Sequence, residues 1–179
     1  LPTVQAATNC AAVTEIPPAL CDTLLALYNS TGGANWTNKM GWNKTNTPCS
    51  WNGIYCGGGN NVIVINLGSN NLKGSLPKLS ALTGLWHLEL SVNQLTGTIP
   101  DLSKLTSLRE LHFGGNQLTG TIPDLSKLTS LRVLALWGNQ LTGTIPDLSK
   151  LTSLQTLYLQ SNQLTGAIPD LSKLTSLQF

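Results

Sequence analysis

Two histidines and two glutamates are the residues of this chain whose types and spacing could do chemistry. The spacing from His87 to Glu110 equals the spacing from Glu89 to His112. Imidazole and carboxylate side chains form ion pairs across neighbouring strands, and both are also ligands for transition metals. We interpret the four residues as two His–Glu ion pairs, with a surface metal site as the alternative. Catalysis is not expected, because no nucleophile and no third orienting group accompany them.

The spacing of these four residues follows from a repeat that runs through most of the chain. The 14-residue block LTGTIPDLSKLTSL recurs with a 23-residue period, and the stretches between successive copies differ. A fixed period of this length predicts a solenoid, because one such unit cannot bury its apolar face alone and must stack on its neighbours. The copies cover residues 95–108, 118–131, 141–154 and, with Ala167 as the one change, 164–177, and a looser copy covers residues 72–85.

The pattern L-x-x-L-x-L-x-x-N-x-L is present in Leu108, Leu111, Phe113, Asn116 and Leu118. It is identified as the leucine-rich repeat. The G-x-I-P that follows resembles the plant-specific subclass of polygalacturonase-inhibiting proteins, receptor-kinase ectodomains and secreted proteins of protists and bacteria. The resemblance implies an α/β solenoid, a right-handed superhelix with a parallel concave β-sheet, 23-residue coils and a disulfide-bonded N-terminal cap. The repeat of this subclass is usually longer by a single residue, so a tighter convex side is expected here.

Residues 1–61 are predicted to form an N-terminal arm and a cysteine-containing cap, with a helix over about residues 19–30. Residues 62–179 are predicted to form the repeats, as five coils and the start of a sixth. The four cysteines allow three pairings. The stretch PCSWNGIYC resembles the cap of plant-type repeat proteins, which implies disulfides Cys49–Cys56 and Cys10–Cys21. Trp36, Trp42 and Trp51 are predicted to pack inside this cap.

Cysteines and glycosylation acceptors indicate an extracellular protein, secreted or at the cell surface. The acceptors are Asn29, Asn35 and Asn43, each in an N-x-T context. Only 10% of the residues are charged and the formal net charge is +2, without the clustered Lys and Arg of a nucleic-acid surface. No apolar run is long enough to cross a membrane. We expect no enzyme activity, no cofactor and no bound metal.

Several positions that repeat without change are predicted to be structural. The asparagines Asn70, Asn93, Asn116, Asn139 and Asn162 fall where each strand ends, and we expect them to satisfy backbone groups between rungs. Asp101 and its copies are expected to cap one helical turn on the convex side, and Lys104 and its copies to offset their charge. The threonines of each T-G-T are expected to face outward as a grid.

The residues that differ between copies fall on the outward positions of the strands. A nearly identical scaffold with diversified outward residues is typical of a binding surface, since drift would also change convex positions. Trp137 and Tyr158 are aromatics of the kind that anchor interfaces. We therefore predict a recognition module that binds a protein, peptide or glycan on its concave face. The predicted contact residues are His87, Glu89, Glu110, His112, Val133, Ala135, Trp137, Thr156, Tyr158 and Gln160.

Two other functions are considered beside recognition. The chain ends within a repeat and without a cysteine-containing C-terminal cap, so a structural protein could self-associate through that uncapped end. Outward threonine grids also occur on ice-binding solenoids, so the T-G-T rows make ice binding the third hypothesis.

Overall fold

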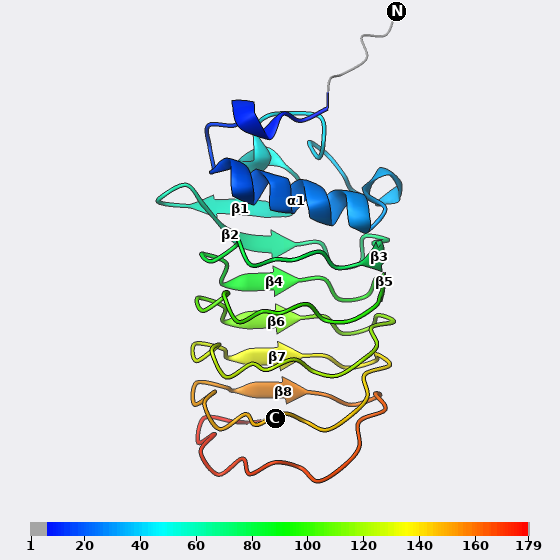
Figure 1. The fold of residues 1–179 in the computed structure, drawn as a ribbon, viewed down its shortest axis with the longest axis vertical. Helices are drawn as coiled ribbons and strands as arrows, with labels where there is room; N and C mark the ends of the chain where they lie inside the picture. The colour runs from blue at the N-terminus through cyan, green and yellow to red at the C-terminus, as the bar shows by residue number, and fades with distance from the viewer. Residues whose placement is uncertain (1–6, 179) are drawn as a thin grey trace, which may run out of the picture.

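The computed structural model describes residues 7–178, and its repeats stack as one column of parallel strands (Figure 1). The main sheet has the order β1-β2-β4-β6-β7-β8, in which the β1–β2 pair is antiparallel and every later pair is parallel. Its strands are β1 (Ile54–Gly57), β2 (Asn61–Asn66), β4 (His87–Glu89), β6 (Glu110–His112), β7 (Val133–Ala135) and β8 (Thr156–Tyr158). The predicted leucine-rich repeat solenoid with a parallel sheet is confirmed.

Leucines fix the register of this sheet. Leu88 pairs with Leu111, and Leu111 with Leu134, and all three side chains are at most 1% exposed. The residues on either side of each leucine point to the opposite face. A slip of one residue would turn each buried leucine to solvent, so the register of the outward residues is fixed as well.

The convex side is built from turns where the sequence predicts one turn of helix. Within one unit, the Leu105 amide donates to Leu102 O and the Leu108 amide donates to Leu105 O, both at 2.9 Å. These three leucines are 0% exposed. Burying every third residue requires close to three residues per turn, which matches successive tight turns and does not match the 3.6-residue period of an α-helix. The predicted helical turn is therefore replaced by two consecutive turns.

The carboxylates at the start of these turns are held by serine. Asp101 Oδ1 accepts from the Ser103 amide at 2.8 Å, and Asp101 Oδ2 accepts from Ser103 Oγ at 3.1 Å. These bonds hold the pKa of Asp101 below its ordinary value of 3.8, and the charge of Lys104 contributes less to the lowering. The same bonds to serine and the same direction of pKa shift recur in the other units, at Asp124, Asp147 and Asp170. Because the convex side has no helical turn, the predicted helix-capping role is wrong, and Asp101 instead accepts from Ser103 at the start of a tight turn.

A second, short sheet lies where each coil turns away from the main sheet. It consists of β3 (Lys73–Ser75) and β5 (Gln94–Thr96), paired in parallel, and it continues as single bridges that join Thr98 to Thr119 and Thr121 to Thr142. Each bridge joins the second threonine of one T-G-T to the first threonine of the next, so the bridged residues are not equivalent in the repeat. The bend comes from glycine: Gly97 and Gly120 have φ of 75° and 76°. The predicted grid of aligned threonines is therefore staggered.

The N-terminal cap covers the first rung with one α-helix and three indoles. Helix α1 (Pro18–Ser30) occupies the region where a helix over about residues 19–30 is predicted. Trp36, Trp42 and Trp51 are at most 2% exposed and pack in sequence, Trp42 against both of the others, as the sequence predicts. Three 3₁₀ turns complete the cap: η1 (Cys10–Ala12), η2 (Gly33–Asn35) and η3 (Pro48–Ser50). Among residues 7–178, no helix combines the length and apolarity that a bilayer crossing requires.

Two disulfides hold this cap, Cys10–Cys21 and Cys49–Cys56, which confirms the implied pairing. The end of the N-terminal arm is also fixed: Thr8 Oγ1 donates to Thr45 O at 2.7 Å, and the Asn9 amide donates to Asn46 Oδ1 at 2.8 Å. Residues 1–6 of the predicted arm lie outside the described residues.

Asparagine side chains join successive rungs. Asn116 Oδ1 accepts from the Leu95 amide at 3.0 Å, and Asn116 Nδ2 donates to Leu90 O and Phe113 O, both at 3.0 Å. The Leu90 and Leu95 groups belong to the preceding coil, and the Phe113 group to its own coil. Asn139 repeats these contacts one coil later. The predicted structural role of these asparagines is confirmed by this geometry.

Replacing Asn116 by alanine should lower the free energy of unfolding by about 1–3 kcal/mol, because it leaves the Leu95 amide without a partner. The carbonyls of Leu90 and Phe113 each lose only one of two asparagine donors. Asn162 makes matching bonds but is more exposed, so Asn162→Ala should cost less than half as much. Urea denaturation followed by circular dichroism measures both. Equal losses would contradict an inter-rung role that depends on burial.

Stability should also fall in acid because of the aspartate–serine bonds. A carboxyl whose folded pKa lies below its unfolded value stabilises the fold above the unfolded value, and this contribution is lost as the pH falls through the folded pKa. We expect the melting temperature to decline below about pH 4. A variant with all four of these aspartates changed to asparagine should show a flatter decline. Parallel curves for the two proteins would rule out this source of acid sensitivity.

Candidate functional site on the concave face

The outward residues of the main sheet form three columns, because the strands pair in register. We call this surface the concave face. The first column holds Val64, His87, Glu110, Val133 and Thr156, the second holds Asn66, Glu89, His112, Ala135 and Tyr158, and the third holds Gly68, Ser91, Gly114, Trp137 and Gln160. All ten predicted contact residues therefore lie on one surface, as the repeat pattern requires.

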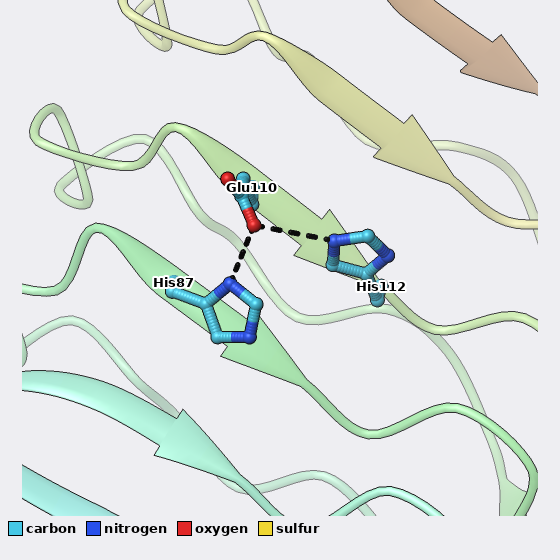
Figure 2. Close-up of side chains that lie close together, drawn as sticks. All are labelled: His87, Glu110 and His112. Atoms are coloured by element: carbon cyan, nitrogen blue, oxygen red, sulfur yellow. Dashed lines mark hydrogen bonds and ion pairs between the residues drawn. The ribbon is translucent and has the colours of Figure 1, made fainter.

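The two histidines and two glutamates meet on β4 and β6. His87 Nδ1 lies 2.7 Å from Glu110 Oε2, a hydrogen bond between neighbouring strands. His112 Nδ1 lies 3.8 Å from Glu89 Oε2, which is an ion-pair distance without a hydrogen bond. His112 Nε2 also lies 3.7 Å from Glu110 Oε2 (Figure 2). The four side chains thus form one linked cluster, whereas the sequence predicts two separate pairs.

Trp137 lies flat on the preceding rung. A Cβ atom built on Gly114 would come within 2.3 Å of Trp137 Cε2 and Nε1, and one built on Gly115 within 3.2 Å of the same ring. The indole therefore occupies space that only glycine leaves open. Its body is half-buried, while Tyr158 on the next rung is 40% exposed.

The remaining predicted contact residues differ in how accessible they are. Ala135 is only 2% exposed, so it forms the floor between His112 and Tyr158 and offers little contact area of its own. Val133 and Thr156 are half-buried and Gln160 is exposed. The larger side chains of His112 and Tyr158 on the neighbouring strands cover Ala135. The sequence of one strand alone does not show this burial.

Two exposed aromatics beside these columns are absent from the sequence prediction. Trp86 precedes β4 and its ring lies 5.7 Å from that of His87. Tyr55, on β1, is 59% exposed and borders a polar hollow of about 320 Å³ between the cap and the first rung. Trp86 has a sequence signal, because the equivalent positions in later units are Arg109, Arg132 and Gln155. Tyr55 has none, since it lies outside the repeats.

The three predicted glycosylation acceptors lie in the cap and differ in accessibility. Asn29 and Asn35 are exposed. Asn43 is half-buried, and its Oδ1 accepts from the Thr8 amide at 3.2 Å. Accessibility thus favours Asn29 and Asn35 as acceptors over Asn43.

Models of two known families match this chain. The model described as "Leucine Rich repeats (2 copies)" matches residues 106–150 and 129–173. The model described as "Leucine rich repeat N-terminal domain" matches residues 21–57, which include most of α1, the three indoles of the cap and the Cys49–Cys56 disulfide. The two matches thus fall on the repeats and on the cap.

Solved structures of similar architecture include plant receptor ectodomains. The BIR2 ectodomain of Arabidopsis thaliana is 34% identical, with 83% of each chain covered and a TM-score of 0.75. A chain of the BIR3–SERK2 complex of the same plant is 33% identical, with 86% of this chain and 87% of that chain covered and a TM-score of 0.68. Both likenesses extend over the cap and the repeats together.

A plant ice-binding protein is also similar, at 27% identity and a TM-score of 0.72, with 84% of this chain and 50% of that chain covered. The fold therefore carries more than one function among the relatives. The repeats, the cap, its disulfides and the ectodomain likenesses agree on one assignment: this chain belongs to the extracellular, plant-type leucine-rich repeat family.

Proposed function

We propose that this protein is a secreted or cell-surface recognition module that binds a protein or peptide partner on the concave face. The observation that carries the proposal is the contrast between scaffold and surface. The blocks that form the coil are nearly identical from residue 95 to residue 177, while the outward columns change at every rung. A surface selected for contact would diversify in this way.

The composition of the concave face supports a protein or peptide over a small molecule. Trp137 and Tyr158 lie on adjacent rungs with the small Ala135 between His112 and Tyr158, and the charged cluster of β4 and β6 borders this area. Aromatic anchors beside a polar rim are typical of protein interfaces. Similar ectodomains include one crystallised as the BIR3–SERK2 complex, in which the partner is a protein.

A glycan is the alternative ligand class, and the N-terminal end of the face is where it would bind. The hollow beside Tyr55 is lined by amide side chains, among them Asn38, Asn52 and Asn66. An exposed aromatic ring with several amides offers both stacking and hydrogen bonding. The aromatic end at Trp137 and the amide end at Tyr55 thus suit different chemistries, which a mutational test can separate.

Trp137→Ala and Tyr158→Ala should each weaken partner binding by about 1–3 kcal/mol, roughly 5- to 150-fold, with the fold retained. Peptides selected from a displayed random library against the parent protein provide the ligands, and biolayer interferometry measures the affinities. The matched control is Lys150→Ala on the convex side, which should leave affinity unchanged. Peptides whose affinity is insensitive to both aromatic substitutions and sensitive to convex ones would contradict the proposal.

Ice binding is the second candidate, favoured by the likeness to the plant ice-binding protein. The staggered threonines weigh against it, because Thr98 bridges to Thr119 and its methyl group packs over Gly120 of the next rung. We expect no thermal hysteresis from this protein at millimolar concentration. Hysteresis that disappears in Thr121→Leu would make ice binding the function in place of partner recognition.

A further inference from the structure

The positions of His87, Glu110 and His112 are fixed by the backbone before any side-chain contact forms. His87 on β4 is the direct partner of Glu110 on β6, and His112 follows Glu110 by two positions on the same face. Leu88 follows His87 on β4, and Leu111 lies between Glu110 and His112 on β6. Both leucines are at most 1% exposed and anchor their strands in the core. A site built on paired strands is held more rigidly than one built on loops.

The three side chains converge on one oxygen atom. Glu110 Oε2 lies 2.7 Å from His87 Nδ1 and 3.7 Å from His112 Nε2, and the two imidazole rings are 5.5 Å apart between centroids. One ligand atom from each residue can be chosen so that all three lie within 4.8 Å of one another. An ion pair requires one imidazole, whereas here two ring nitrogens face the same carboxylate oxygen (Figure 2).

We propose that His87, Glu110 and His112 form a binding site for a divalent transition-metal ion such as Zn²⁺, on the concave face between β4 and β6. Zn²⁺ binds imidazole nitrogen and carboxylate oxygen at about 2.0–2.2 Å, so tetrahedral ligands lie about 3.3 Å apart. Small side-chain rotations bring the three groups to these distances. The metal would replace the His87–Glu110 hydrogen bond.

Glu89 gives His112 the support that metal-bound histidines usually have. While His112 Nε2 faces Glu110, its Nδ1 lies 3.8 Å from Glu89 Oε2. Glu89 is itself anchored, because its Oε1 accepts from the Ser91 amide at 2.6 Å. A carboxylate that accepts a hydrogen bond from the far nitrogen orients the ring and raises its basicity as a ligand, and Glu89 would make this bond if the 3.8 Å gap closed when the ion binds. Glu89 is therefore a positioning residue and contributes no metal ligand.

The site is open to solvent on one side. The side chains of His87, Glu110 and His112 are 19%, 36% and 23% exposed, so an ion can enter without any opening of the fold. Three protein ligands leave one coordination position of Zn²⁺ for water or for an outside ligand. This inference does not rest on the proposed partner recognition, because the ligands all come from this chain.

Isothermal titration calorimetry of the tag-free chain with ZnCl₂ at neutral pH measures the affinity and the number of ions bound. We expect one ion per chain. His87→Gln, His112→Gln and Glu110→Gln should each weaken the affinity by about 100-fold or more, and Glu89→Gln by about tenfold. Thr152→Ala, at an exposed position of a convex turn, is the control and should bind as the parent does.

Nuclear magnetic resonance keeps the proposal falsifiable if a variant fails to fold. The chain has two histidines, both in the site, so both imidazole signals of the parent protein should shift together on addition of one equivalent of Zn²⁺. Unshifted imidazole signals, or an affinity that Glu110→Gln leaves unchanged, would overturn the site. Joint shifts that end at one equivalent would support it.

Discussion

The hydrogen bonds of the inward-turned asparagines are the interaction on which the rest of this structure depends. Where a short strand ends, its coil must turn, and the backbone groups at the turn lose their strand partners. Asn93, Asn116 and Asn139 supply both the donor and the acceptor that these groups need, and each links its own coil to the one before. No buried side-chain nitrogen or oxygen within residues 7–178 is left without a partner.

The same ladder explains why the fold begins with a separate cap. The first asparagine, Asn70, has no earlier coil to join, and it bonds instead to the backbone of Asn38 through both its Oδ1 and its Nδ2. The indoles of the cap belong to the same buried cluster as the apolar residues of the first rung. Stability in such arrays comes largely from interfaces between neighbours, so the bonds at this junction protect every coil that follows.

Much of this architecture could be predicted from the sequence, because the repeat fixes which residues are equivalent. Because His87 and Glu110 occupy equivalent positions in successive repeats, they could be predicted to lie side by side. The same equivalence predicted that the asparagines bond to backbone groups between rungs. The family resemblance, which is a separate source, implied the Cys10–Cys21 and Cys49–Cys56 disulfides. Two local features that equivalence does not determine were not predicted. They are the turns in place of a helix around Leu105, and the offset between Thr98 and Thr119, which is already present where Lys73 pairs with Gln94. The convergence of His112 on Glu110 depends on side-chain rotamers, so register alone could not reveal it.

The glycine beneath Trp137 has a consequence for how such surfaces diversify. The indole lies over Gly114 of the preceding unit, and Glu89 likewise lies over Gly68, where a Cβ atom would come within 3.2 Å of its Oε1. The rigid indole of Trp137 therefore requires a residue without a side chain at position 114 on the rung before it. Neighbouring units cannot be varied independently, and a library built on this scaffold should randomise adjacent rungs as pairs, with size traded between them.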